Sequence, residues 1–465
     1  MLSRFGSIFA DNFRKWLPDS FIFAILLTFI AGVLAFFWVD AGIFAIIKAW
    51  YGGFFNLLAF AMQMVLILAT GYAIAISPPA AKGIDWLASK TKTPAMVYLV
   101  VTAVGCIFSM ISWGWVVLTA VLGRELAIRV KKVDYRLLAA CVYASILPWH
   151  GGLSGSVPLV INTPNNFLIK QGILSDIIPT TITLTSTMNI ITQLALFITL
   201  PILMLVMKPR EDKVVEFNDL REGGELAKDV TVAEEAEGLR LPFKNISDGL
   251  NSSRIIEGVI ALMGLSYIIW HFATKGFDLN LNIMIFIFII VGMIFHMTPV
   301  RYGVAMKRSC SNVSGIILQF PFYAGIMGIM IHTGLAKAIA LWIAGAASVG
   351  SYPFISFVTG SVVNMFVPSG GGEWAVVGPT IVEAAKQLGT NMSPEMLTDF
   401  IARSSMAVAY GDACTNMIQP FWTLAFMPVV AAGVKLQARD FMGYTFIACI
   451  WSAIIFAICV TWLPM

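Results

Sequence analysis

Charged residues are scarce in this sequence. Asp, Glu, Lys and Arg make up 12% of the 465 residues, whereas hydrophobic residues make up 58%. A soluble domain of this length needs far more charge to cover its surface, so the composition excludes a soluble protein. The net charge is only +4 and the chain has no block of Lys or Arg, so we expect no nucleic-acid partner.

The chain also lacks the common motifs of enzymes, and its cysteines show no paired spacing. Four of its six cysteines lie inside apolar runs, as small buried hydrophobic residues do. There is no HExxH zinc motif, no Walker A lysine and no dinucleotide-binding fingerprint. The segment HGGLSGS (150–156) matches an oxyanion-hole motif and a nucleophile elbow only in part. We therefore expect neither an enzyme nor a cofactor.

Long apolar runs are what the sequence has in abundance, and its mean hydropathy is +0.83. Runs of about 20 residues, each able to cross roughly 30 Å of hydrocarbon as a helix, predict an all-α polytopic protein in a lipid bilayer. The predicted spans are 21–39, 54–76, 179–207, 255–272, 281–296, 314–332 and 441–463. We further predict a helix lying on the membrane surface over 1–20 and a polar, solvated cytoplasmic linker over 208–254.

The distribution of basic residues predicts the orientation. Arg14 and Lys15 place the N-terminus in the cytoplasm by the positive-inside rule. If the apolar stretch 95–122 crossed the membrane, the basic residues of the segment 124–136 would lie outside, against that rule. We therefore predict that 95–122 is a re-entrant hairpin, and the later spans then place the C-terminus in the periplasm.

The two halves of the chain resemble each other at an offset of roughly 260 residues, as in transporters built from repeats. SMISWGWVV (109–117) matches NMFVPSGGGEWAVV (364–377), and YASILPWHGGLSGSVPLV (143–160) matches VAYGDACTNMIQPFWTLAF (408–426). The first copy begins inside and the second outside, which predicts an inverted-topology repeat with 255–272 as its linking span. The first repeat is 21–207, with a hairpin at 95–122 and a broken helix at 137–166; the second is 281–465, with a hairpin at 353–388 and a broken helix at 404–432.

Two re-entrant hairpins and two discontinuous helices would meet near the midplane, because irregular backbone at membrane depth needs protein or a water-filled cavity around it. Glycine amides and half-helix N-termini suit an anion there, whereas hydroxyl and carbonyl oxygens suit Na⁺. The predicted substrate-binding residues are Ser109, Ser112, Trp115, His150, Gly151, Gly152, Ser154, Ser156, Asn364, Ser369, Gly370, Gly371, Gly372 and Trp374. None of them is Lys or Arg, which favours a small monoanion over a di- or tricarboxylate.

Asp412 and Glu373 are the sharpest candidates for cation coupling. A carboxylate inside the membrane costs at least about 2.5 kcal/mol, so a functional role is the default. Each could ligate Na⁺, carry a proton or face an aqueous vestibule. Thr415 and Asn416 complete the predicted coupling set, with a candidate Na⁺ site near Asn364, Asp412 and Asn416.

Several segments resemble the bacterial short-chain fatty acid transporter family over essentially the whole chain. They are WLPDSFIFA (16–24), NLLAFAMQM (56–64), SGSVPL (154–159), LQFPFYAGI (318–326), FVPSGGGEW (366–374) and AYGDACTNMIQPFW (409–422). The resemblance implies uptake of monocarboxylates such as acetoacetate or butyrate across the inner membrane. It also implies kinship with the wider ion-transporter superfamily, hence an elevator mechanism and a homodimer. In that family an acidic residue at the position of Asp412 is typical, whereas an acidic residue at the position of Glu373 is not required.

The sequence therefore predicts a secondary transporter that couples monocarboxylate uptake to Na⁺ or H⁺. A passive anion channel, an exchanger of one acid for another and a membrane enzyme are the alternatives. The sequence does not decide between Na⁺ and H⁺.

Overall fold

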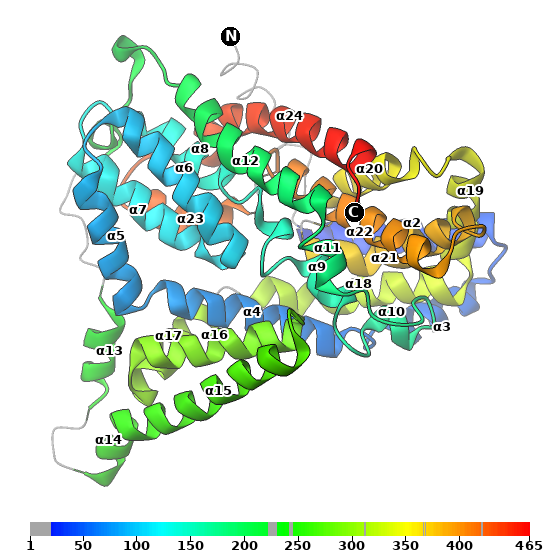
Figure 1. Cartoon of the computed structure of the whole chain (residues 1–465), viewed down its shortest axis with the longest axis horizontal. Helices are drawn as coiled ribbons and strands as arrows, with labels where there is room; N and C mark the ends of the chain where they lie inside the picture. Colours follow the sequence, from blue (N-terminus) through cyan, green and yellow to red (C-terminus); the bar gives the residue numbers. More distant parts are fainter. Residues whose placement is uncertain are drawn as a thin grey trace.

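The computed structural model describes residues 20–221, 230–240, 245–310, 313–365, 367, 369–419 and 422–465. The regular elements of these residues are α- and 3-10 helices (Figure 1). The helical segments long and apolar enough to cross a membrane are Leu58–Ala75, Pro94–Ile111, Tyr135–Ile161, Thr187–Val206, Ile246–Lys275, Ser314–His332 and Ala438–Trp462. The prediction of an all-α polytopic membrane protein is confirmed. The surface helix predicted over 1–20 lies outside the described residues, except for Ser20.

One group of helices, which we call the framework helices, contains five of the predicted spans and one further helix packed on them. Its members are α2 (Ser20–Trp38), α3 (Ile43–Gly53), α4 (Leu58–Ala75), α15 (Arg254–Lys275), α16 (Leu281–His296) and α18 (Ser314–His332). α3 and α18 touch backbone to backbone: a Cβ atom on Gly53 would lie 2.6 Å from the carbonyl oxygen of Ala324, and one on Gly328 would lie 2.5 Å from that of Ala49. Only glycine permits so close a contact.

A second group, which we call the hairpin bundle, contains both predicted hairpins. In the first, α6 (Pro94–Ile111) and α7 (Val116–Arg129) pack against each other. The hydroxyl of Thr93 caps α6 by accepting from the amide of Met96, and Pro94 suits the first turn. The chain leaves α6 at Ser112 in an extended conformation and reaches α7 through a 3-10 turn, Trp113–Trp115.

The second hairpin is built in the same way. Its helices are α20 (Tyr352–Asn364) and α21 (Gly370–Leu388). Ser369 is extended and its hydroxyl accepts from the amide of Gly372 at 3.3 Å, which starts α21. The structure thus interrupts both helix pairs within the segments where the sequence places the hairpin tips.

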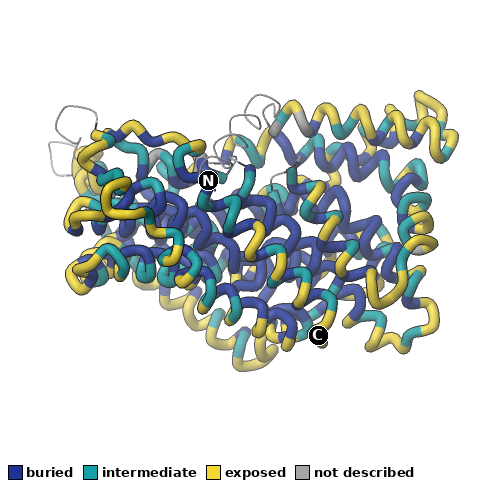
Figure 2. Tube along the Cα trace, turned by 90° about the horizontal axis from the view of Figure 1, so that it is seen from above, coloured by how far each residue is buried: buried dark blue, intermediate teal, exposed yellow. Residues whose placement is uncertain are grey.

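Two interrupted helices complete the bundle, together with the spans that follow them. The elements are α8 (Tyr135–Ala144), the 3-10 turn η2 (Trp149–Gly151), α9 (Ser156–Ile161), α12 (Thr187–Val206), α22 (Pro394–Thr415), α23 (Thr423–Val430) and α24 (Ala438–Trp462). α22 lies tightly on α20: a Cβ atom on Gly411 would lie 2.3 Å from the carbonyl oxygen of Phe357. Figure 2 shows buried residues running through the middle of the molecule, with exposed residues at its periphery.

One predicted span begins later in the structure and another is divided, and several connections are helical. The helix predicted over 54–76 begins at Leu58, after turns. The span predicted over 179–207 is divided into α11 (Thr180–Thr183) and α12, because the hydroxyl of Ser186 caps α12 by accepting from Asn189. The helices that the sequence analysis left out are α3, α5 (Pro78–Lys90), α10 (Phe167–Lys170), α17 (Pro299–Cys310) and α19 (Leu335–Ala346). α5 and α19 follow α4 and α18, so they take corresponding places in the two halves.

The first part of the polar linker packs on the hairpin bundle instead of lying in solvent. It contains η3 (Glu211–Lys213) and η4 (Phe217–Leu220). The amide of Tyr135 donates to the carbonyl of Val215 at 2.8 Å, and the amide of Lys435 donates to that of Leu220 at 2.7 Å. The ring of Phe217 is buried against that of Tyr135. Apolar residues within a charged segment account for this docking.

The second part of the linker packs beside the framework helices, on the helix α17 that precedes α18. α13 (Val232–Gly238) buries Val232 and Ala236 against α17, next to α4. The guanidinium of Arg308 donates to the carboxylate of Glu235 at 2.6 Å and to the carbonyl of Val230 at 2.9 Å. α14 (Ile246–Asn251) then leads into α15. The described parts of the linker therefore bridge the two groups of helices.

Candidate functional site

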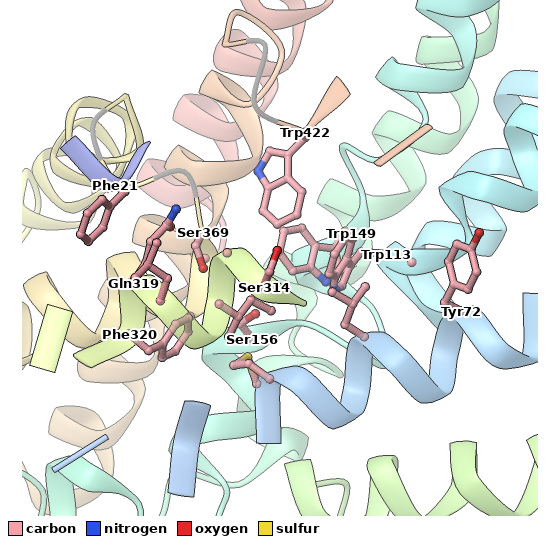
Figure 3. A pocket seen from close by; sticks show the side chains of 18 of the residues that line it. Phe21, Tyr72, Trp113, Trp149, Ser156, Ser314, Gln319, Phe320, Ser369 and Trp422 are labelled. Carbon is pink, nitrogen blue, oxygen red and sulfur yellow. The ribbon is translucent and has the colours of Figure 1, made fainter. Parts of the chain in front are cut away.

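A cavity of about 460 Å³ lies where the framework helices meet the hairpin bundle (Figure 3). The framework supplies lining residues from α2, α4 and α18, and the bundle supplies both hairpin tips and both helix breaks. The lining residues are Phe21, Met64, Leu68, Tyr72, Trp113, Gly114, Val117, Trp149, Ser156, Ser314, Gly315, Ile316, Leu318, Gln319, Phe320, Ser369, Gly370, Gly371 and Trp422. None of these residues is ionised at neutral pH.

Three tryptophans form an aromatic wall on one side of this cavity (Figure 3). Trp113 comes from the first hairpin tip, Trp149 from the first broken helix and Trp422 from the second. The ring centroids of Trp113 and Trp422 are 4.8 Å apart, and that of Trp149 lies 5.8 Å from Trp113 and 5.9 Å from Trp422. Segments far apart in the sequence thus build one apolar surface.

The polar lining comes from serine hydroxyls and the start of α21. Ser156, Ser314 and Ser369 line the cavity together with Gly370 and Gly371. The first amides of a helix have no acceptor within it and carry the positive end of its dipole. A Cβ atom on Gly370 would lie 2.4 Å from Cε1 of His150, so glycine is what lets the helix start approach this histidine.

Directly beside this helix start lies a buried cluster of three titratable side chains. Nε2 of His150 lies 2.7 Å from Oδ2 of Asp412, and the carboxyl group of Glu373 is buried nearby, with no hydrogen bond to Asp412. The three side chains are at most 1% exposed. Within the described residues, both carboxyl oxygens of Glu373, Oδ1 of Asp412 and Nδ1 of His150 have no hydrogen-bond partner. Such unsatisfied buried groups are rare and call for an explanation.

A network of amides holds the end of α22 in place. Nδ2 of Asn364 donates to the carbonyl of Asp412, to Oγ1 of Thr415 and to Oδ1 of Asn416 at 2.8–3.0 Å. Nδ2 of Asn416 donates to Oδ2 of Asp412 at 2.9 Å, and Nε2 of Gln419 donates to Oδ1 of Asn416 at 3.2 Å. At the candidate Na⁺ site, Oδ2 of Asp412 and Oδ1 of Asn416 therefore already accept hydrogen bonds from amides, whereas Oδ1 of Asp412 has no partner among the described residues.

The structure brings part of the predicted site together. Ser156, Ser369, Gly370 and Gly371 line the cavity. Other predicted residues stand next to it or behind it, in the buried cluster or the amide network; these are His150, Asn364, Gly372, Glu373, Asp412, Thr415 and Asn416.

The remaining predicted residues make packing contacts within the bundle or between the bundle and the framework helices. The hydroxyl of Ser109 donates to the carbonyl of Ser145 at 2.8 Å, and the indole of Trp115 donates to that of Gly71 at 2.9 Å. Trp374 is fully buried one helical turn beyond Gly370 and packs on Gly378. Three further residues are closely packed against neighbouring segments. Ser112 lies at the first hairpin tip, and Gly151 and Gly152 lie at the first helix break. The backbone carbonyl of Ser154 accepts from the indole of Trp149 at 3.0 Å.

Sequence reasoning missed the residues that the framework helices contribute. Ser314 and Gln319 line the cavity from α18, and Met64 lines it from α4. Gln319 also accepts from the hydroxyl of Tyr323 at 2.9 Å, whereas Gln63 on α4 donates to Asn282 on α16 at 2.7 Å. The sequence did carry a signal for the tryptophan wall of the bundle, because Trp113, Trp149 and Trp422 each flank a break in a helix.

Comparison with known proteins agrees with this architecture. The family model described as "Short chain fatty acid transporter" matches residues 1–463. The chain belongs to this family. A relative from Escherichia coli, whose name assigns it provisionally to short-chain fatty acid transport, is 36% identical over 464 residues, covering 99% of this chain and 100% of its own. A relative of the same description from Haemophilus influenzae is also 36% identical, covering 98% and 99%.

Solved structures share the fold of this transporter. MtrF of Neisseria gonorrhoeae, described as illuminating a class of antimetabolite efflux pumps, superposes with a TM-score of 0.54 at 17% identity, covering 96% of both chains. The YdaH transporter of Alcanivorax borkumensis, whose topology is described as unusual, gives 0.53 at 15% identity, covering 96% of this chain and 97% of its own. The family and the relatives are transporters, so the expectation that the chain is not an enzyme is confirmed.

Proposed function

We propose that this transporter is a cation-coupled symporter for short-chain monocarboxylates such as acetoacetate or butyrate, located in the bacterial inner membrane. The observation that carries the proposal is the two-sided cavity between the framework helices and the hairpin bundle. Ligand pockets usually measure about 300–1,000 Å³, and this one of about 460 Å³ falls in that range.

The two sides of the cavity match the two parts of a short-chain acid. The carboxylate binds at the amides of Gly370 and Gly371 and at the hydroxyls of Ser156 and Ser369, where the dipole of α21 favours an anion. The alkyl chain lies on the tryptophan wall, where each buried methylene contributes about 0.8 kcal/mol. The cavity offers no Lys or Arg for a second carboxylate.

The position of the cavity supports alternating access. The hairpin bundle is tightly packed within itself at α20 and α22, and the framework is tightly packed at α3 and α18. A site on the boundary between two rigid groups changes its exposure when one moves against the other, as in an elevator mechanism. The cytoplasmic N-terminus, the periplasmic C-terminus and the homodimer stay predictions.

Transport assays on proteoliposomes test the proposal. Purified transporter is reconstituted, and uptake of labelled acetoacetate is measured under separately imposed proton, sodium and voltage gradients, with protein-free liposomes as the blank. A symporter accumulates the acid above its equilibrium distribution under one cation gradient. Saturable flux without accumulation would indicate a channel, and uptake only into liposomes preloaded with an acid would indicate an exchanger.

A further inference from the structure

The carboxyl groups of Glu373 and Asp412 pose an electrostatic problem. Glu373 in the first turn of α21 and Asp412 near the end of α22 are buried close to each other, and within the described residues Glu373 has no donor for either oxygen. Two carboxylates buried near each other in a low-dielectric site repel each other when both are ionised, so one proton shared by the pair relieves that repulsion. Titratable side chains near this pair include His150 on η2, Tyr143 on α8 and Tyr323 on α18, and Tyr410 and Cys414 lie on α22 itself.

The surroundings of Asp412 favour a proton over Na⁺. Na⁺ requires several oxygen ligands at once, but Oδ2 of Asp412 already accepts from Asn416 and faces His150, and Oδ1 of Asn416 already accepts from Asn364 and Gln419. The atoms that remain are the two oxygens of Glu373, Oδ1 of Asp412 and Nδ1 of His150. Each of these atoms can take a proton, whereas a Na⁺ ion at this cluster would have only the three carboxylate oxygens as free side-chain ligands.

We propose that Glu373, Asp412 and His150 form the proton-binding site of this transporter, so that the coupling ion is H⁺. The inference rests on the proposed symport and names its ion. With one shared proton the cluster carries a single negative charge. A second proton, on the carboxyl pair or on Nδ1 of His150, neutralises it.

The same cluster is in physical contact with the substrate cavity. The ring of His150 stacks on that of Trp149 with centroids 4.0 Å apart, and Trp149 lines the cavity. Gly370 approaches His150 and also lines the cavity. A negative cluster repels a carboxylate at the start of α21, and protonation removes that repulsion. The proton therefore binds before the anion, and one proton with one monoanion moves no net charge.

The test compares two modes of transport in the same proteoliposomes. Accumulation of labelled acetoacetate is driven by an inward proton gradient, and exchange of labelled for unlabelled acetoacetate is measured without any gradient. Glu373→Gln and Asp412→Asn keep the shape of the side chains but cannot cycle a proton. We expect both variants to lose proton-driven accumulation and to keep exchange. Glu257→Gln is the matched control, because Glu257 on α15 is also buried, at 4% exposure, but lies outside the cluster; it keeps both modes.

Several results would overturn the inference. One is proton-driven accumulation at the parent level in both Glu373→Gln and Asp412→Asn. Another is accumulation by the parent protein under a sodium gradient with none under a proton gradient. Loss of both modes in the two variants, with normal elution from a sizing column, would show that the cluster binds substrate instead of protons. If the parent protein shows no saturable transport under any gradient, the proposed function itself is wrong.

Discussion

Replacing Trp113 with alanine should allow this transporter to bind acids with longer alkyl chains. Trp113 packs on both other indoles of the tryptophan wall, and next to it lies a small void of about 10 Å³ lined also by Val116, Ile146, Trp149 and Trp422. The Trp113 indole, like those of Trp149 and Trp422, lines both this void and the substrate cavity and so forms part of the partition between them. Its removal joins the two spaces and leaves room for a longer alkyl chain.

The magnitude follows from the burial of methylene groups. Each methylene moved from water into the enlarged cavity stabilises binding by about 0.8 kcal/mol, or roughly fourfold in affinity. Hexanoate, with two methylenes more than butyrate, should therefore gain about 15-fold relative to butyrate in Trp113→Ala. Butyrate itself should bind more weakly, because it loses the face of the indole.

Competition assays measure this shift. Unlabelled acids of two to eight carbons compete with labelled acetoacetate, and the ratio of inhibition constants for hexanoate and butyrate is compared between variants. Trp342→Ala is the matched control, because Trp342 on α19 is 64% exposed and outside the cavity. An unchanged ratio in Trp113→Ala, with transport still saturable, would refute the assignment of the wall to the alkyl chain.

Three further predictions concern binding, packing and the linker. Ser369→Ala should raise the KM for acetoacetate about 10-fold or more, because losing a hydrogen bond to a charged group costs about 1.5–3 kcal/mol. Ser266→Ala, on the exposed face of α15, should leave the KM unchanged. Gly53→Ala should lower the melting temperature measured by thermal unfolding in detergent, because its Cβ atom meets the backbone of α18 and overpacking costs about 1–3 kcal/mol. Gly52→Ala should leave the melting temperature unchanged, because its Cβ atom meets no atom within 4 Å. Arg308→Gln should increase protease cleavage within residues 222–240 by removing the contacts to Glu235 and Val230; an unchanged digestion rate would count against docking of α13.

Features encoded by local sequence were predictable. Pro148, the glycines near it and the run Gly370 to Gly372 interrupt apolar segments, and the structure breaks its helices at those segments. Ser369 and Thr93 precede helix starts and cap them, as their hydroxyls allow. Asp412 and Glu373 stood out because acids are costly in such surroundings, and the structure buries them together.

Features that depend on packing between distant segments were not predictable. Trp374 follows the glycine run in sequence but lies a helical turn deeper, against Gly378, and local sequence does not show which indole faces a cavity. Ser314 comes from α18, which a composition-based analysis assigns to ordinary membrane-spanning structure. The pairing of His150 with Asp412 joins residues 262 positions apart in the chain.

The docking of the linker sets a geometric limit on any motion between the two groups of helices. Arg221 is bridged to Val434 on the hairpin bundle, whereas Val230 is held by Arg308 on α17. The nine peptide units between positions 221 and 230 can reach at most about 30 Å when fully extended. As long as both attachments hold, the two anchor points cannot separate beyond that distance, and a longer stroke requires one end of the linker to detach.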